Sequence, residues 1–542
     1  MQYQEEQEFS KHISLGIWKK LLGFGKAFKS KFIMIALSMT VLAVSDVIIP
    51  LMTRYGIDHF VVPRTLDGLP GFILTYGLLL VMQVISIYVF ILKAGQVDNG
   101  MSYTIRREGF KKLQELPFSY YDRMPVGYLM SRMTSDARNL GEAFGWGLVD
   151  MVWAVVYLLA SITSMLLIDW RLTLIILLVG PPLALVSIYF QRKILRNHRE
   201  VRKTNSRITS AFNEGIMGAK TSKTLVREEM NSQEFQEISG SMKKISIKAA
   251  NLSSIYLPLV ISISSMATAY VLTEGSSLVL KGVMTLGTIT AFFNYSLSMF
   301  EPIHNIAATL SEMQRMQAAA ERVVSMLETE SDIQDTPEVI ARYGDSLEPK
   351  KENWPSIKGD VFFDRVTFKY KDGETVLKDF SLDVKKGETI ALVGPTGAGK
   401  STIVNLLCRF YEPTEGVIRI DGTDYKERSQ LWLQSNLGYV LQDPHLFSGS
   451  IRDNIRYAKP NATDDEVQKA AQLVNAESFI LSLENGYDTD VGEAGNRLST
   501  GEKQLVSFAR AILHNPRIFV LDEATSSVDT ETEALIQKAI EK

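Results

Sequence analysis

Long apolar runs are the feature of this sequence that most constrains its fold. Six runs approach the about 20 residues that a helix needs to cross the hydrocarbon core of a bilayer, and all six lie in the first 310 residues of the 542-residue chain. They cover residues 32–53, 72–92, 146–168, 172–190, 254–273 and 286–310. The sequence therefore predicts an α-helical, six-span transmembrane domain over residues 31–320.

The N-terminal 30 residues are polar and rich in lysine. A cleaved secretory signal would instead carry a short apolar segment here. The segment from Leu15 to Phe28 alternates apolar residues with lysines, which is typical either of a helix lying on a membrane surface or of an amphipathic helix packed on protein. We expect residues 1–30 to form a cytoplasmic N-terminus with an interfacial helix.

Basic residues between the spans predict the orientation in the membrane. The N-terminal segment and the connections over residues 94–145 and 191–253 hold 26 Lys and Arg, whereas the other connections hold 4. Because Lys and Arg are retained on the cytoplasmic side, both termini should be cytoplasmic. The two basic connections are long and have helical periodicity, so we expect the spans to continue as helices into the cytosol, in two long cytoplasmic loops.

Three carboxylates lie inside the predicted spans, Asp46, Asp150 and Glu301, and Asp150 stands near the end of its span, where water can reach it. A charged side chain in the centre of a bilayer costs about 2.5 to 3.5 kcal/mol on insertion scales, so it usually faces a cavity or a partner. Asp46 and Glu301 are therefore candidates for the substrate path. Pro302 follows Glu301 and predicts a local kink in the last span.

The charge and cysteine content exclude other classes of protein. The formal net charge is −3, so no global basic field favours nucleic acid as a partner. The single cysteine, Cys408, cannot form an internal disulfide or, alone, a zinc site.

A polar, proline-containing stretch over residues 321–356 is typical of a linker. Beyond it, residues 357–542 predict a soluble α/β domain. Residues 359–392 show the alternation of strands, and the last expected strand, 389–393, leads into GPTGAGKS, which runs from Gly394 to Ser401. An apolar-periodic helix follows. Strand, glycine-rich loop and helix are the context of a phosphate-binding P-loop.

The chemistry of that loop is specific. Successive backbone N–H groups and a helix N-terminus form an anion cradle, which bulky side chains would obstruct. Gly394, Gly397 and Gly399 permit the close approach. Lys400 would reach the β- and γ-phosphates, and Ser401 would coordinate Mg²⁺.

A second motif follows near the end of the sequence. The run from Arg517 to Leu521 predicts a buried parallel strand ending in Asp522 and Glu523. Ligands of an open α/β sheet collect at this end of the strands. Asp522 is placed to hold Mg²⁺ through water, and Glu523 to polarise the attacking water.

Several further segments resemble motifs of ATP-binding cassette (ABC) proteins. The sequence LSTGE at Leu498–Glu502 is similar to the family signature, the segment around Gln442 to the Q-loop, and Ser526 to Asp529 to the D-loop. Tyr370 stands where the family has an adenine-stacking aromatic. Residues 118–136 resemble the first intracellular loop of multidrug-type ABC exporters, so the resemblance covers nearly the whole chain.

The resemblance implies one half of a two-half exporter that binds ATP and Mg²⁺. Two nucleotide-binding domains would clamp two ATP molecules head to tail, each between one chain's P-loop and the other chain's signature. The implied ATP-binding residues are Tyr370, Gly394, Thr396, Gly397, Gly399, Lys400, Ser401, Thr402 and Gln442. The implied metal-site residues are Ser401, Gln442 and Asp522, the catalytic residue is Glu523, the D-loop residues are Ser526 and Asp529, and the residues presented to the partner's ATP are Leu498, Ser499, Thr500, Gly501 and Glu502.

The signature departs from the family pattern at two positions. Thr500 replaces the first of two glycines, and Glu502 replaces a glutamine. A β-branched side chain can crowd the amides that approach a γ-phosphate, and a nearby carboxylate repels it. Because Glu523 is intact, we expect an asymmetric heterodimer in preference to a homodimer that tolerates the variation.

The family also places a switch histidine roughly thirty residues after the catalytic glutamate. The sequence ends at Lys542 without one. We expect the C-terminal end of the nucleotide-binding domain to lie beyond this sequence.

Taken with the spans, the resemblance implies ATP-driven export of hydrophobic or amphipathic compounds (drugs, lipids or peptides) by alternating access, across the membrane of a bacterial cell. The alternative is an ATP-gated channel or regulatory half-subunit on the same scaffold. Glu523 favours turnover over gating. The fused spans exclude soluble P-loop enzymes and disfavour importer ATPases, whose spans normally lie on a separate chain.

Overall fold

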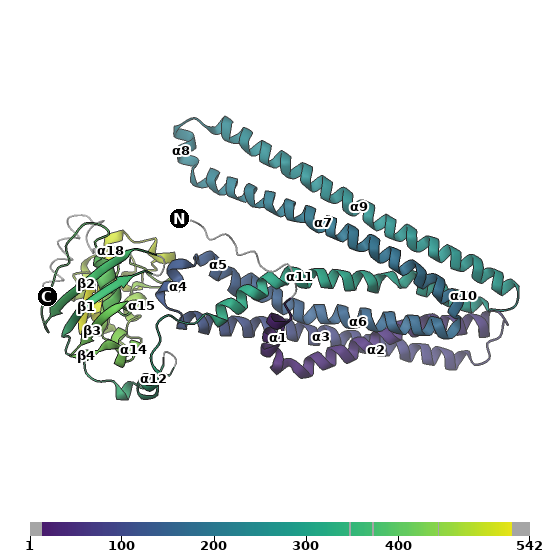
Figure 1. Ribbon diagram of the computed structural model, residues 1–542, viewed down its shortest axis with the longest axis horizontal. Helices are drawn as coiled ribbons and strands as arrows, with labels where there is room; N and C mark the ends of the chain where they lie inside the picture. The colour runs from purple at the N-terminus through teal and green to yellow at the C-terminus, as the bar shows by residue number, and fades with distance from the viewer. Residues whose placement is uncertain (1–13, 346–347, 371–372, 443, 523–542) are drawn as a thin grey trace. The chain divides into compact units, whose positions relative to one another are not determined.

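The computed structural model describes residues 14–345, 348–370, 373–442 and 444–522, which form two compact units (Figure 1). The first unit comprises the chain up to Leu113 together with Gly127–Glu328. The second comprises Gln114–Val126 and the chain from Thr329 onward. A short segment of the connection between two long helices therefore belongs to the same compact unit as the C-terminal third.

The first unit is helical throughout its secondary structure. Its helices are α1 (Leu15–Phe24), α2 (Lys29–Gly56), α3 (Leu69–Glu115), α5 (Val126–Ser131), α6 (Ala137–Ile168), α7 (Trp170–Met217), α8 (Ala219–Thr224), α9 (Glu228–Leu280), α10 (Leu286–Ser298) and α11 (Phe300–Glu328). Short π-helical turns at Ile57–Val61 and Arg132–Asp136 extend α2 and precede α6.

Within the described ranges of the chain, five helical stretches are long and apolar enough to cross a membrane. They are Gly16–Val61, Leu69–Glu115, Val126–Ile168, Trp170–Met217 and Glu228–Leu280. The sixth expected span, 286–310, is divided between α10 and α11, which are separated at Met299. Pro302 lies in the first turn of α11, where a residue without a backbone N–H is tolerated. The unit is therefore a membrane-spanning helical domain in which five continuous spans are found.

Three helices are much longer than a bilayer is thick. α3, α7 and α9 have 47, 48 and 53 residues, about 70 to 80 Å at 1.5 Å per residue, against a hydrocarbon core of about 30 Å. In Figure 1, α7 and α9 run side by side and α8 joins them at one end. The expected continuation of the spans as helices beyond the membrane is confirmed.

Two apolar clusters hold the helical unit together. One joins α1, α2, α3, α6 and α11 around Trp18, Met101 and Leu140. The other joins α2, α6, α7, α9 and α10 around Tyr157 and Tyr295. In the most apolar window of α3, only 11% of the residues are buried, as expected for a helix whose side chains face lipid.

Helices α3 and α6 approach each other through glycines. A Cβ atom added to Gly141 would lie 2.5 Å from the carbonyl oxygen of Asp98, and one added to Gly145 would lie 2.8 Å from that of Ala94. Small residues spaced four apart allow such close backbone contact in membrane helices. The packing of α6 on α3 therefore requires glycine at both positions.

Helix α1 packs on protein. Trp18 and Leu21 are buried, and the Trp18 indole N–H donates to Gln317 Oε1 of α11 at 2.8 Å. Lys19 and Lys20 are exposed on the opposite face. Lys20 pairs with Glu328 of α11 at 2.5 Å, so both faces of α1 contact α11.

The second unit is α/β. Its strands are β1 (Val361–Lys369), β2 (Thr375–Val384), β3 (Glu415–Ile420), β4 (Thr423–Asp424), β5 (Leu437–Val440) and β6 (Ile518–Leu521), and its helices are α4 (Phe118–Arg123), α12 (Pro337–Tyr343), α13 (Lys400–Leu407), α14 (Gln430–Gln434), α15 (Ile451–Arg456), α16 (Asp464–Leu473), α17 (Glu477–Ser482) and α18 (Thr500–Leu513). An antiparallel sheet has the order β2-β1-β3-β4, and β5 pairs in parallel with β6.

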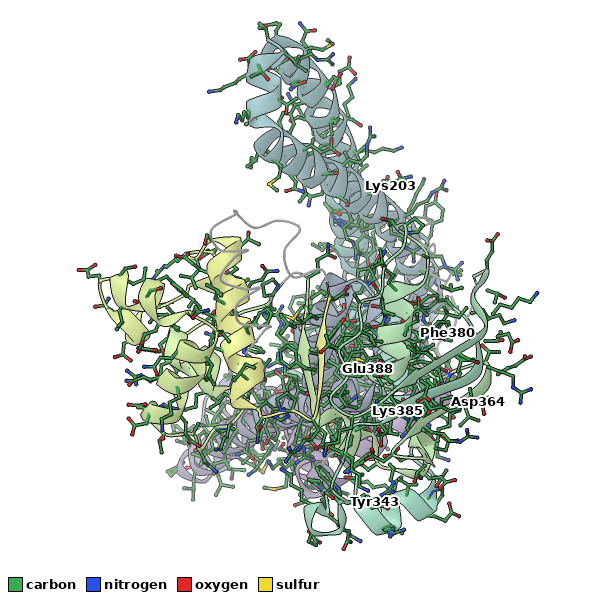
Figure 2. All side chains as sticks on the ribbon, turned by 90° about the vertical axis from the view of Figure 1, so that its left-hand side faces the viewer. Lys203, Tyr343, Asp364, Phe380, Lys385 and Glu388 are labelled. Atoms are coloured by element: carbon green, nitrogen blue, oxygen red, sulfur yellow. The ribbon has the colours of Figure 1, made fainter. Side chains whose placement is uncertain are left out.

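Two expectations for this unit differ from the structure. Residues 389–393 form no strand, and Val393 is 92% exposed. Only five residues separate the Gly-rich loop from the turn at Lys385–Glu388, in which the Lys385 N–H donates to Glu388 Oε2 (Figure 2). A strand of at most five residues would form few backbone hydrogen bonds with a neighbouring strand, so its pairing would be weak. Helix α11 continues to Glu328, past the expected start of the linker at residue 321, because Val323, Val324 and Met326 are buried.

Candidate nucleotide-binding site

The glycine-rich loop lies directly before α13. Gly399 is the N-cap of that helix and has φ +91°, in the left-handed region that glycine adopts without strain. A Cβ atom on Gly399 would lie 3.0 Å from Leu377 Cδ2. The helix N-terminus therefore opens onto a loop without bulky side chains, which is the geometry of an anion cradle.

Lys400 lies over this loop. Its Nζ donates to the carbonyl oxygens of Gly394 at 2.6 Å and Pro395 at 3.2 Å. The ammonium group therefore lies against the carbonyl oxygens at the start of the loop, and it can supply positive charge for a polyphosphate.

The aromatic Tyr370 is oriented by the P-loop helix. Its hydroxyl lies 3.2 Å from Thr402 Oγ1, and its ring packs edge-on against Phe368 and Tyr411 at centroid distances of 4.9 and 5.1 Å. Because β1 ends at Lys369, the ring stands at the end of the strand nearest to α13.

Two more expected residues follow parallel strands. Asp522 comes directly after β6, and Gln442 follows the end of β5 by two residues, in the same direction. Parallel pairing brings both to one edge of the sheet, where ligands of α/β proteins bind. Burial, with the neighbouring Asp522 carboxylate, raises the pKa of Tyr439 to about 12.

The oxygen donors present fit a hard cation. Hydroxyl, carboxylate and amide oxygens of Ser401, Asp522 and Gln442 are ligands that Mg²⁺ accepts, with phosphates and water completing its shell. Among the described residues there is no cluster of three or more His, Cys, Asp or Glu that could hold a metal ion. Glu523, Ser526 and Asp529 lie outside the described residues.

The signature region forms the N-terminus of α18. Ser499 is the N-cap, Leu498 and Gly501 are buried, and Thr500 is exposed. Glu502 closes a capping box: its Oε2 accepts from the Ser499 backbone N–H at 2.8 Å and from Ser499 Oγ at 2.9 Å, and its own N–H donates to that Oγ at 3.3 Å. The Glu502 carboxylate thus lies at the N-terminus of α18, the positive end of the helix dipole.

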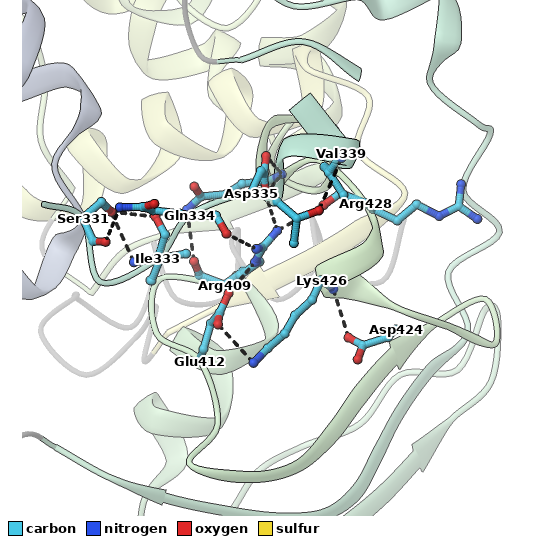
Figure 3. A network of polar contacts seen from close by, with 12 residues as sticks. Ser331, Ile333, Gln334, Asp335, Val339, Arg409, Glu412, Asp424, Lys426 and Arg428 are labelled. Atoms are coloured by element: carbon cyan, nitrogen blue, oxygen red, sulfur yellow. Dashed lines mark hydrogen bonds and ion pairs between the residues drawn. The ribbon is translucent and has the colours of Figure 1, made fainter. Parts of the chain in front are cut away.

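A buried arginine follows the P-loop helix and was not among the residues expected from sequence (Figure 3). Arg409 is 1% exposed. Its guanidinium donates to Asp335 Oδ1 at 2.7 Å, to Glu412 Oε1 at 3.0 Å and to the carbonyl oxygen of Arg428 at 3.1 Å. Asp335 also accepts from the backbone N–H of Gln430 at 3.1 Å. We call Arg409, Asp335 and Glu412 the linker clamp, because they fix the linker to the end of the P-loop helix.

The short helix α4 contacts the same region. The Phe118 ring lies 4.2 Å from that of Phe410, the Tyr411 hydroxyl donates to Asp122, and the Arg123 guanidinium pairs with Asp332 at 3.4 Å. Burial and the Asp122 carboxylate raise the pKa of Tyr411. Residues 408–412, continuous with the P-loop helix, therefore touch both α4 and the linker.

The two carboxylates expected on a substrate path are brought together in the helical unit. Asp46 of α2 and Glu301 of α11 line one cavity of about 350 Å³ with residues of α6 and α10.

A membrane-spanning helical unit fused to a P-loop nucleotide-binding unit defines an ATP-dependent membrane transporter. The family model described as ABC transporter transmembrane region matches residues 32–303, and the one described as ABC transporter matches residues 377–526. The chain therefore belongs to the ATP-binding cassette transporter family, with the transmembrane and ATP-binding regions of one half-transporter fused in that order.

Curated bacterial relatives match most of the chain. The Bacillus subtilis ABC transporter ATP-binding protein YfiC is 33% identical over 97% of this chain and 85% of its own length. The probable multidrug resistance ABC transporter ATP-binding/permease protein YheH of B. subtilis is 34% identical over 90% of this chain and 71% of its own. A fatty acid ABC transporter ATP-binding/permease protein of Mycobacterium bovis is 35% identical over 90% and 74%. The chain is thus an ABC exporter, an ATP hydrolase whose hydrolysis is coupled to transport, and exporters of this kind act as dimers.

Proposed function

We propose that this chain is one half of a heterodimeric exporter with two unequal ATP sites. The chain supplies a complete P-loop and a catalytic glutamate to one site, and an altered signature to the other. One site would hydrolyse ATP and the other would hold it.

The single observation that carries the asymmetry is the capping box of α18. A signature serine is useful to a partner's γ-phosphate when its hydroxyl and the amides of the helix N-terminus can donate to that phosphate. Here the Ser499 hydroxyl and backbone N–H donate to Glu502. The Glu502 charge offsets the helix dipole and repels a phosphate anion, and Thr500 adds bulk beside it.

At the chain's own P-loop the roles follow from chemistry. Loop amides from Gly394 to Gly399 and the N-terminus of α13 would bind the phosphates, Lys400 would neutralise their charge, and Tyr370 would stack on adenine. Ser401, Asp522 and Gln442 would hold Mg²⁺, directly or through water. When bound, Mg²⁺ would draw charge from the phosphate oxygens. Glu523 would orient the attacking water, and Ser526 and Asp529 would face the partner.

Residues 408–412 support a route from nucleotide to membrane helices. Closure of the phosphate site moves α13, and its continuation is held to α4 and to the linker by Tyr411, Phe410 and Arg409. Motion of the P-loop helix would therefore be passed to both connections of this unit with the helical domain, which would alternate its access.

We further propose six spans with both termini in the cytoplasm of a bacterial cell. The predominance of Lys and Arg in alternate connections supports this orientation, and α10 with the start of α11 would form the sixth span. The cargo would be a hydrophobic or amphipathic compound, which agrees with the names of the multidrug and fatty acid relatives.

Transport and composition can be tested together. The tagged chain is expressed with candidate partner halves and purified. The mass of the purified complex in detergent gives its subunit composition. Inside-out vesicles are then assayed for ATP-dependent accumulation of a fluorescent amphipathic dye. We expect a one-to-one complex and dye uptake that stops in Lys400→Ala. A functional dimer of this chain alone would contradict the heterodimer, and the absence of ATP-dependent uptake for any hydrophobic dye would contradict export.

A further inference from the structure

The cavity that Asp46 and Glu301 share is lined by acidic, aromatic and polar side chains. It measures about 350 Å³ and is lined by the two carboxylates, the aromatic Trp153 and Tyr157, and the polar Asn294 and Ser298, among others. Its volume is near the lower end of ligand pockets, which range over about 300 to 1,000 Å³. None of the described residues lining it is Lys, Arg or His.

The hydrogen bonds of Asp46 indicate which form of this carboxyl group the cavity is built for. Its Oδ1 accepts from Gln83 Nε2 at 2.7 Å, and its Oδ2 accepts from the Trp153 indole N–H at 3.0 Å. An indole N–H and an amide NH₂ can only donate. Since both oxygens accept, the geometry matches the ionised carboxylate and leaves no oxygen serving as an O–H donor to these two partners.

The arginine next to the cavity lining pairs with another carboxylate. Arg54 lies one residue beyond Thr53, which also lines the cavity, but its guanidinium pairs with Asp58 at 3.9 Å. The Asp58 carboxylate in turn accepts from the N–H of Gly287 at 2.9 Å, at the start of α10. An anionic cavity among apolar helices is costly unless a cation occupies it.

The aromatic wall favours an organic cation over a metal ion. Trp153 and Tyr157 are stacked, with ring centroids 5.2 Å apart and planes at 22°. Aromatic faces attract ammonium and delocalised cations, whereas a hard metal ion would need a nearly complete shell of oxygens. Asp46 is half-buried and Glu301 is exposed within the single chain, so the cavity is open on the side of Glu301.

We propose that this cavity is a binding site for the positively charged group of an amphipathic organic cation, with Asp46 and Glu301 as counter-charges and Trp153 and Tyr157 as the aromatic wall. This inference rests on the proposed export function and names the charge class of one of its substrates. Asp46 is the fixed counter-charge, because Gln83 of α3 and Trp153 of α6 donate to its carboxylate. Glu301 is exposed, so an entering ligand would meet its carboxylate first.

The test uses the assembled transporter in lipid nanodiscs with ethidium, a permanent cation, as a fluorescent probe. Asp46→Asn and Glu301→Gln retain side-chain shape and remove one charge each. We expect each variant to bind ethidium about tenfold more weakly, equivalent to about 1.4 kcal/mol, and Asp150→Asn, a carboxylate of α6 outside the cavity, to bind within twofold of the unaltered protein. Phenyltrimethylammonium should displace ethidium, whereas its neutral isostere tert-butylbenzene should not.

Ethidium affinity unchanged in both cavity variants, or equal displacement by the charged and neutral isosteres, would overturn the inference. ATP binding at the P-loop verifies that each variant is folded, and Glu301→Gln decides alone if Asp46→Asn does not fold. ATP-driven uptake of an uncharged dye is measured in vesicles of the same preparations. If ATP drives uptake of the uncharged dye while the cavity variants bind ethidium with normal affinity, the proposed cation site is contradicted and the proposed export function is not. If ATP drives uptake of neither dye, the proposed export function fails.

Discussion

The Glu502 side chain occupies the helix N-terminus that a phosphate would otherwise bind. The capping box that stabilises α18 uses the same hydroxyl and the same positive helix end that a phosphate would need. A glutamine at this position can make the same capping box without the charge. The two roles of Glu502, stabilising the helix and repelling an anion, are therefore separable by one substitution.

We predict that Glu502→Gln leaves the free energy of unfolding within about 0.5 kcal/mol of the unaltered value. It should also tighten ATP-analogue binding at the partner's P-loop in the assembled dimer about threefold to fivefold, since a charge at a helix terminus is worth up to about 1 kcal/mol. Equilibrium binding of a non-hydrolysable analogue measures this. Glu466→Gln is the matched control, because Thr463 and Glu466 form the same capping box on α16. Equal affinities in both variants would show that the Glu502 charge does not reach the nucleotide.

Lys400 provides a second test at this scale. Lys400→Ala removes the ammonium group that donates to the P-loop carbonyl oxygens, and we expect ATP binding to this chain to weaken about 100-fold, the loss of roughly 2.7 kcal/mol. Lys385→Ala, whose side chain is exposed and pairs with Asp383 outside the loop, should bind ATP normally. Fluorescent-analogue titration of the full chain distinguishes the two.

Sequence alone predicted roles for the P-loop residues but did not predict the burial of Arg409. The motif from Gly394 to Ser401 is short and continuous, so its spacing is enough to give each position a role. An arginine just after an amphipathic helix is typical of a solvated charge. Its burial depends on Asp335, which precedes it by 74 residues, and on Glu412, and such a long-range pairing leaves no local pattern.

At the scale of elements, the linker clamp joins segments that are separate in sequence. We predict that Arg409→Ala lowers the local stability of α13 by about 3 to 5 kcal/mol, because Arg409 is buried and its loss leaves Asp335, whose side chain is only 13% exposed, without its charge partner. Lys426→Met is the control: Lys426 approaches the other oxygen of Glu412 at 3.1 Å with 41% of its side chain exposed, and such a pair is worth at most about 1 kcal/mol. Hydrogen exchange of the α13 amides in the full chain measures both. Similar protection in the two variants would assign the clamp no stabilising role.

The contact between α4 and Tyr411 permits a prediction about coupling. Tyr411→Phe keeps the ring and removes the hydroxyl that donates to Asp122. We expect ATP binding to be unchanged and the number of substrate molecules moved per ATP to fall by roughly half or more, since the lost hydroxyl is one of the contacts that hold α4 to the end of the P-loop helix. Tyr343→Phe, on α12 away from α4, is the control. A transport-to-hydrolysis ratio equal to that of the unaltered protein would contradict a coupling role.

The elements were predictable where periodicity is strong and long. The spans, the strands β1 and β2, and α13 appear near their expected positions. The division of the last span at Met299 and the missing strand at residues 389–393 were not predictable in detail, because short segments next to Pro302 or glycine turns depend on packing partners. Helix α11 continues to Glu328 because Val323 and Val324 are buried. The surrounding sequence is polar, so this burial could not be predicted from local composition.

For the whole molecule, the chain carries half of what an ABC exporter needs. In the proposed function its P-loop, Asp522 and Glu523 serve one ATP, and its signature is offered to another. The order of the two domains and the P-loop chemistry could be predicted from sequence. Asp46 by itself suits a cationic cargo, but the full lining of the proposed cation site could not be predicted, because Asp46, Trp153 and Glu301 come together only when α2, α6 and α11 pack around one cavity.

ATP hydrolysis in lipid vesicles tests the asymmetry most directly. It is measured for the full chain alone, for the chain with its partner half, and for the pair carrying Glu523→Gln in this chain. We predict little activity alone, full activity with the partner, and loss of at least about 100-fold in the Glu523→Gln pair, as expected when the group that orients the attacking water is removed. Full, cooperative hydrolysis by the chain alone would contradict the proposal of two unequal sites.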